Sequence, residues 1–183
     1  MNARPLILIA TLAAAGSLRA AEEEFTHRVF GLFAPERETA LRDALTKIGV
    51  TLVRVDFPNA EATVRFDPAI VFKDTKPEKL TDRLNESLRD ATRATFSIAP
   101  RIPRENLTTV EIAVAGCDCP ACNFAAYEVL AQIDGVAAAT VSFRTGKATA
   151  RIDSAKTNRT ALEEALKKRG VTLPAPPPTE PAK

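Results

Sequence analysis

The chain has 183 residues, of which 45% are hydrophobic and 26% charged, a composition typical of a folded globular protein and not of a disordered or collagen-like one. Its 25 Lys and Arg residues against 23 Asp and Glu residues give a formal charge of +2 with no long block of either sign, and aromatic residues make up only 5%. Nucleic-acid binding proteins need a basic patch or a set of stacking aromatics, so we expect no nucleic-acid partner.

The first 20 residues have the layout of a secretory signal peptide. Basic Arg4 is followed by the apolar stretch Pro5 to Ala15 and by small residues ending at Ala20. This apolar stretch is shorter than the roughly 20 residues that a transmembrane helix needs. The alternative is an N-terminal core helix, but no later segment resembles its packing partner. We therefore expect residues 1–20 to be removed on export to the periplasm or the extracellular space, leaving a chain without a membrane span.

Residues 25–99 are expected to form a first domain with the element order βαββαβ. Hydrophobic residues recur every second position in the predicted strands and every third or fourth position in the predicted helices. The predicted elements are strand His27–Phe33, helix Glu36–Ile48, a hairpin around Pro58 and Asn59, helix Pro77–Ala91 and strand Thr95–Ile98. Pro100 and Pro103 then mark a boundary, because proline continues neither a helix nor a central strand.

Residues 106–173 are expected to form a second domain with the same element order. The predicted elements are strand Thr108–Ala115, a helix from Pro120 that ends before Gly135, a hairpin turning at Thr145 and Gly146, helix Thr160–Lys168 and strand Val171–Leu173. This order with short connections predicts an α+β protein of two ferredoxin-like sandwiches in tandem. Residues 174–183 are rich in proline and are predicted to form a disordered, extended tail.

The two predicted domains resemble each other in sequence. Pairing residues 50–69 with residues 136–155 without gaps gives eight identities in twenty positions, where chance would give about one or two. Upstream, residues 31–37 align with residues 116–122. We interpret the pattern as an internal duplication, so both copies are expected to share one fold.

All three cysteines lie in one short segment, residues 117–122, between the first strand and the first helix of the second domain. A C-x-x-C motif that crosses a loop and the first turn of a helix lets the sulfurs of Cys119 and Cys122 converge. The helix N-terminus favours thiolates by lowering their pKa. Thiolates are the ligands that soft metal ions prefer, so this segment is the candidate metal site.

The segment Gly116–Cys122, followed by Gly135–Val136 and by residues 141–149, resembles the heavy-metal-associated domain family. That family includes copper chaperones, the N-terminal domains of metal-exporting P-type ATPases and a periplasmic mercuric-ion binding protein. The resemblance implies that Cys119 and Cys122 bind the metal and that the partner is a membrane metal transporter or another metal-binding domain. The resemblance to the family covers the second domain. The first domain resembles the family only as a degenerate copy, with Ala34 and Arg37 where the cysteines should be.

Three departures from the family pattern bear on the identity of the ion. Cys117 replaces the usual Met, which implies either a third sulfur ligand or a thiol buried in the core. Asp118 resembles the residue before the motif in zinc, cadmium and lead exporters, where the carboxylate joins the thiolates. The resemblance also places a basic loop beside the metal loop, with three candidates to offset the charge of the bound ion: Lys167, Lys168 and Arg169. The ion stays open among Cu(I), Zn(II), Cd(II) and Hg(II).

Two other functions fit the same cysteines. The pair could close into a disulfide, either inert or as the redox couple of a thiol-disulfide module, or the chain could be a structural adaptor. Three cysteines argue against an inert bridge because one is left over. A redox enzyme usually carries C-x-x-C in a thioredoxin-like unit, whose strand order differs from the one predicted here.

The remaining chemistry-bearing residues have plainer interpretations. His27 is expected at the surface or rim of the first domain, and Tyr127 is expected to cover the sheet edge or face solvent. No carboxylate pair, Ser/His arrangement or phosphate loop stands out, so no catalytic residue is predicted. We expect an exported protein, not an enzyme, that captures or hands on a soft or borderline metal ion by ligand exchange.

Overall fold

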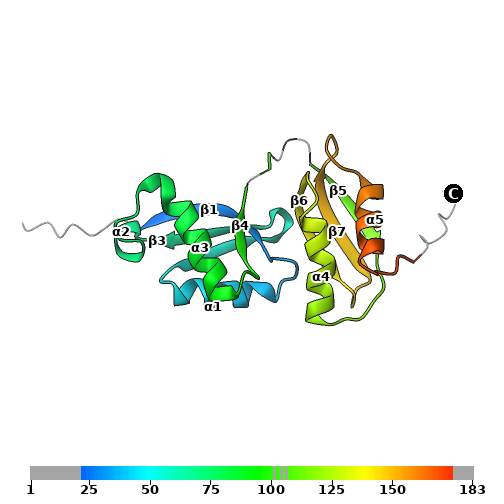
Figure 1. The fold of residues 1–183 in the computed structure, drawn as a ribbon, viewed down its shortest axis with the longest axis horizontal. Helices are drawn as coiled ribbons and strands as arrows, with labels where there is room; N and C mark the ends of the chain where they lie inside the picture. The colour runs from blue at the N-terminus through cyan, green and yellow to red at the C-terminus, as the bar shows by residue number, and fades with distance from the viewer. Residues whose placement is uncertain (1–21, 101, 104, 106, 175–183) are drawn as a thin grey trace, which may run out of the picture.

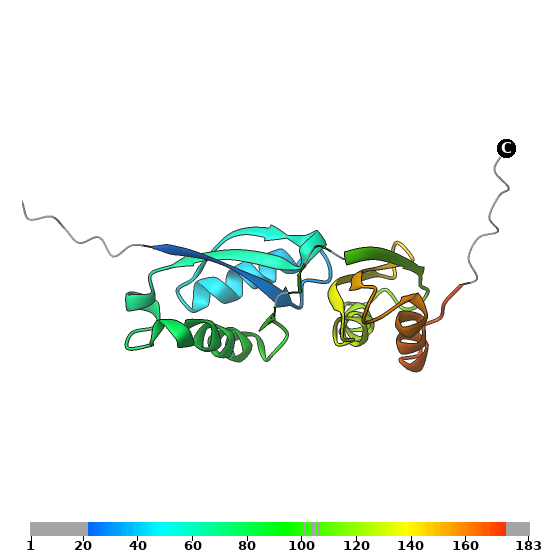
Figure 2. The ribbon, with the colours of Figure 1, turned by 90° about the horizontal axis from the view of Figure 1, so that it is seen from above.

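The computed structural model describes residues 22–174 except 101, 104 and 106. The predicted signal peptide at 1–20 and residues 175–183 of the predicted tail lie outside the described residues. Two domains lie side by side, each with its helices packed against one face of an antiparallel sheet (Figures 1 and 2). Within the described part of the chain, no helix combines the length and the apolar character needed to cross a membrane.

The first domain has the predicted βαββαβ order with one added short helix, α2. Its elements are β1 (Glu23–Phe30), α1 (Arg37–Lys47), β2 (Thr51–Asp56), the 3-10 turn η1 (Phe57–Asn59), β3 (Glu61–Phe66), α2 (Pro68–Val71), the 3-10 turn η2 (Pro77–Lys79), α3 (Leu80–Thr92) and β4 (Ser97–Ala99). The sheet order is β2-β3-β1-β4, with β1 antiparallel to both β3 and β4. This is the strand order of a ferredoxin-like sandwich.

The helices of the first domain are held by leucines on their inner faces. Leu41 and Leu45 of α1 and Leu84 and Leu88 of α3 are each at most 2% exposed and pack against the sheet in one core. Their spacing of four residues places each pair on the same side of its helix. Burying side chains of this size contributes about 1.5–3 kcal/mol each relative to leaving them exposed.

The second domain repeats the arrangement with a sheet of three strands in place of four. Its elements are β5 (Leu107–Ala113), α4 (Pro120–Ala131), β6 (Val136–Ser142), β7 (Lys147–Asp153) and α5 (Arg159–Lys168), and the sheet order is β5-β7-β6. The strand predicted at Val171–Leu173 is only a bridge. Thr172 exchanges backbone hydrogen bonds of 3.2 and 2.8 Å with Ala115. The segment is short because Gly170 has a φ of +84° and Pro174 has no N–H to extend the pairing.

The first domain covers the free edge of the second sheet, strand β6. A bulge in β6 leaves Ala137 without a partner on β7. Arg28 of β1 donates from Nε to the carbonyl of Ala137 at 2.5 Å and from Nη2 to the carbonyl of Val136 at 2.8 Å. Further along, the N–H of Val141 donates to the carbonyl of Phe33 at 3.4 Å. An exposed edge strand invites pairing with other chains, and these contacts block that route.

An aromatic cluster joins the end of β1 and the loop after it to helix α4. Phe30 and Phe33 of the first domain lie with ring centroids 5.1 to 6.3 Å from Phe124 and Tyr127 of α4. Phe33 belongs to the hydrophobic core of the second domain. The two domains therefore share buried apolar surface as well as hydrogen bonds.

Tyr127 is buried at this junction, so the prediction that it covers a sheet edge or faces solvent is wrong. It is 2% exposed, and its hydroxyl accepts a hydrogen bond of 2.8 Å from the N–H of Gly31. Burial raises the pKa of Tyr127 to about 12, although the Gly31 bond and nearby arginines act in the other direction. The sequence of the second domain alone does not show that the loop of another domain will cover this side chain.

Gly31 is needed for this close contact. Its φ of +102° is a conformation that other residues rarely adopt, and a Cβ atom there would lie 2.3 Å from the carbonyl oxygen of Thr95. The missing side chain lets the loop between β1 and α1 pack closely against Thr95 and Phe96 of its own domain, in the conformation that presents the N–H of Gly31 to Tyr127.

Candidate metal centre

The turn into helix α4 places the three cysteines. Pro120 is the first residue of α4, and Cys119 precedes it as the N-cap, with its Sγ accepting the N–H of Cys122 at 3.0 Å. The N–H of Cys119 donates to the carbonyl of Cys117 at 2.9 Å. This three-residue turn folds Cys117 back beside Cys119.

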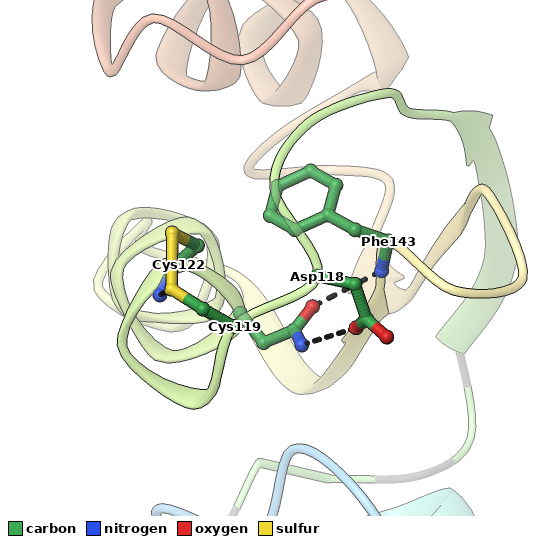
Figure 3. Close-up of a disulfide and its surroundings, with 5 residues drawn as sticks. Asp118, Cys119, Cys122 and Phe143 are labelled. Atoms are coloured by element: carbon green, nitrogen blue, oxygen red, sulfur yellow. Dashed lines mark hydrogen bonds between the residues drawn. A yellow bond between two sulfur atoms is a disulfide. The ribbon is translucent and has the colours of Figure 1, made fainter.

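The three sulfur atoms form one cluster. All lie within 4.8 Å of one another, with Cys117 exposed and the other two half-buried. Cys119 and Cys122 are joined by a disulfide with a Cα–Cα distance of 5.1 Å (Figure 3). Cys117 is a free thiol. Within the described ranges, no other group of three or more Cys, His, Asp or Glu side chains lies close enough to share an ion.

The interpretation of Cys117 as a buried core thiol is wrong, because its side chain is exposed. The ring of Phe143 packs beneath the loop instead. A Cβ atom on Gly116 would lie 2.9 Å from Cε1 of this ring. With the space under the loop filled, the side chain of Cys117 stays on the solvent side with the other two sulfurs.

Asp118 ties the cysteine loop to the β6–β7 hairpin. Its Oδ1 accepts from Nδ2 of Asn123 at 3.1 Å, and its Oδ2 accepts from Nε of Arg144 at 3.2 Å. Asn123 in turn accepts the N–H of Phe143 at 3.0 Å (Figure 3). The hydrogen bond from Asn123, and then that from Arg144, hold the pKa of Asp118 below its usual range. Both carboxylate oxygens therefore have partners other than a metal ion.

A pocket of about 220 Å³ opens beside the sulfurs. Cys117 and Cys122 lie on one side of it, and Phe143, Arg169 and Val171 are among the residues that complete its wall. Of the three basic residues predicted to balance charge, Arg169 lines this pocket. The other two, Lys167 and Lys168, are exposed in the last turn of α5 and do not line it.

Sequence reasoning named Asp118 and the cysteines but missed the residues that hold their loop. Asn123 bonds both Asp118 and the backbone of Phe143, and Arg144 completes the connection. The signal was present. Asn123 is a polar residue in a helix that is otherwise mostly apolar, and it lies one position after the motif.

The equivalent loop of the first domain contains an arginine in place of the second cysteine. Arg37 begins helix α1, and its Nε donates to the carbonyl of Gly31 at 3.2 Å. Its guanidinium carbon lies 4.2 Å from the ring centroid of Phe96 and 5.3 Å from that of Phe33. In this domain the loop is therefore stabilised by an arginine stacked on aromatic rings, and it serves to contact the second domain.

Comparison with known proteins gives similarity to solved structures only. No protein-family model and no curated protein matches the chain. A structure titled CopZ metallochaperone is 26% identical, covering 36% of this chain and 98% of that one, with a TM-score of 0.35. Oxidized MerP from Ralstonia metallidurans CH34 is 29% identical over 37% of this chain and 96% of that one, with a TM-score of 0.34.

A two-domain structure is also similar over most of the chain. The N-terminal soluble domains of Bacillus subtilis CopA are 21% identical and cover 84% of this chain and 93% of that one, with a TM-score of 0.34. All three TM-scores lie below 0.5, so what this chain binds is inferred from its own residues.

Proposed function

We propose that this chain is an exported metal-binding protein, not an enzyme, that holds a soft or borderline ion between the thiolates of Cys119 and Cys122. The observation that carries the proposal is the position of these two sulfurs at the N-terminus of α4, beside a pocket open to solvent. A site sealed beneath the sheet could neither receive an ion nor release it.

The local charge distribution favours thiolates. The first turn of α4 presents the positive end of the helix dipole, and the N–H of Cys122 bonds the sulfur of Cys119. Both effects stabilise negative charge on a sulfur at this position. The disulfide uses both sulfurs, so metal binding first requires its reduction by a dithiol reductant, which gives up two electrons and two protons and closes into its own disulfide, leaving two thiols that then ionise.

Release would occur by ligand exchange. A partner's thiolate can enter through the pocket beside Cys122 and bind the ion before the sulfurs of this chain dissociate from it. The partner would be a membrane metal transporter or another metal-binding domain with its own exposed cysteines. The first domain would serve as a fixed docking or spacing unit, because it already covers β6 and α4.

The disulfide also favours a second candidate function, thiol-disulfide exchange. The free thiol of Cys117 lies within 4.8 Å of both bridged sulfurs. As a thiolate it could attack one of them, forming a new disulfide and releasing the other as a thiolate. This exchange needs no external oxidant.

Native mass spectrometry of the reduced full chain tests the first function. Offered Cu(I), Zn(II), Cd(II) and Hg(II) in turn, the protein should take up one ion per chain. The double variant Cys119→Ser and Cys122→Ser should take up none, with unchanged circular dichroism as the folding control. Equal uptake by the double variant would refute the metal function. No uptake by the native chain, together with a reduction potential in the range of known oxidoreductases, would favour thiol-disulfide exchange. N-terminal sequencing of the exported product tests cleavage near Ala21.

A further inference from the structure

The sulfur of Cys117 lies as close to the other two as a shared ion requires. A tetrahedral zinc-thiolate site with bonds of about 2.3 Å has its sulfurs about 3.8 Å apart, and a trigonal one about 4.0 Å. The three sulfurs here already lie within 4.8 Å of one another. Reduction of the disulfide lets the Cys119 and Cys122 sulfurs separate, and a small rotation of the exposed Cys117 side chain brings all three into range.

The sulfur of Cys117 is better placed to serve as a third donor than the neighbouring carboxylate. Both oxygens of Asp118 accept hydrogen bonds, one from Asn123 and one from Arg144. An ion bound to Asp118 would compete with these two donors for the carboxylate oxygens. Cys117 faces no such competition when it binds an ion, because it is a free and exposed thiol.

The surroundings suit a metal-thiolate complex with one net negative charge. Three thiolates around a divalent ion carry this charge, as do two around Cu(I), and the pocket beside Cys117 and Cys122 contains one cation, Arg169, among its lining residues. The same pocket leaves room for a partner's thiolate on the open side of the ion. A linear two-sulfur ion such as Cu(I) would leave Cys117 without a role.

We propose, resting on the proposed function, that Cys117 is the third metal ligand and that the site is selective for soft divalent ions that accept three thiolates, with Cd(II) as the representative. Binding Cd(II) releases the three thiol protons to solvent and involves no oxidation. Cys117 would then raise the affinity for Cd(II) more than the affinity for Cu(I), which two thiolates already satisfy.

The test compares Cd(II) and Cu(I) binding to the reduced full chain and to the variants Cys117→Ser, Cys119→Ser and Asp118→Asn. Affinities come from competition with a chelator, and X-ray absorption counts the sulfur neighbours of bound Cd(II). The native chain should show three sulfur neighbours. Cys117→Ser should show two and should bind Cd(II) about 100-fold more weakly, with Cu(I) affinity within about threefold of native. Asp118→Asn should keep three sulfurs and native Cd(II) affinity. Cys117→Ser is exposed, and its thermal unfolding should match that of the native chain.

The outcomes separate this proposal from the proposed function. If Cys117→Ser keeps native Cd(II) affinity and sulfur count while Cys119→Ser loses binding, Cys117 is not a ligand and the two-cysteine function stands. If Cys117→Ser weakens Cu(I) as much as Cd(II), the proposed selectivity is wrong. If neither ion binds the native chain, the proposed function fails, and this inference fails with it.

Discussion

At the scale of single residues, the hydroxyl of Tyr127 stabilises the junction between the domains, and its contribution to the free energy of unfolding can be measured. It accepts the N–H of Gly31, a buried residue in the loop of the other domain. In Tyr127→Phe the ring stays but this N–H loses its partner, which costs about 1–3 kcal/mol for a buried donor. Urea unfolding should show that loss with an unchanged denaturant dependence. A variant as stable as the native chain would mean that water replaces the hydroxyl.

The raised pKa of Tyr127 predicts how stability depends on pH at the alkaline end. A tyrosine has a pKa of about 10 when unfolded, and burial raises that of Tyr127 to about 12. Above pH 10 the unfolded chain loses this proton first. The stabilisation is therefore complete below about pH 10 and falls by about 2–3 kcal/mol as pH rises through 12.

The variant Tyr127→Phe is the matched control for this pH dependence. Unfolding free energies measured from about pH 9 to about pH 12 should fall less steeply for the variant than for the native chain, because other groups titrate equally in both. Parallel curves for the two proteins would show that Tyr127 does not contribute to the pH dependence of the unfolding free energy.

At the scale of elements, Cys119 is both a proposed metal ligand and the N-cap of α4. Serine is among the best N-cap residues and alanine among the poor ones. In the reduced protein, Cys119→Ser should therefore weaken metal binding at least as much as Cys117→Ser does, with little loss of stability, whereas Cys119→Ala should weaken binding equally and cost about 1 kcal/mol. Thermal unfolding of both reduced variants checks this. Equal stability of the two would mean that the sulfur does not cap the helix.

Most elements could be predicted from the sequence because the hydrophobic periodicity agrees with the positions of the proline and glycine residues that begin or end elements. Pro120 begins α4 and the Thr145–Gly146 turn separates β6 from β7, both as predicted. Helix α2 was missed although its signal is local: Asp67 caps it by accepting the N–H of Ala69 at 2.9 Å, with Pro68 in its first turn. A helix of four residues is too short to show a hydrophobic period.

The candidate site was predictable in part. The spacing of Cys119 and Cys122 on either side of a helix-starting proline predicts their convergence at the N-terminus of α4. The exposure of Cys117 depends on Phe143 filling the space under the loop, and this ring comes from a segment more than 20 residues away in the chain. Contacts between elements of this kind have no local signature in one sequence.

At the scale of the whole molecule, Phe33 links the two domains. It comes from the first domain but is 6% exposed within the core of the second. Phe33→Ala should cost about 3–5 kcal/mol, since large-to-small changes in a core leave a cavity. The lost stability comes from contacts between the two domains, so urea unfolding should change from one transition to two. The radius of gyration measured by X-ray scattering should also be larger. Exposed Ile70→Ala is the control, and a single transition in Phe33→Ala would contradict a shared core.

The central claim, that Cys119 and Cys122 bind a metal ion at the N-terminus of α4, is tested most directly by cysteine alkylation. The reduced full chain is treated with an alkylating reagent with and without one equivalent of Hg(II), and peptide mass spectrometry reports the rate at each cysteine. The account predicts that the ion strongly slows the reaction at both Cys119 and Cys122. Unchanged rates at these two cysteines, with the ion shown to be bound elsewhere or not at all, would contradict it.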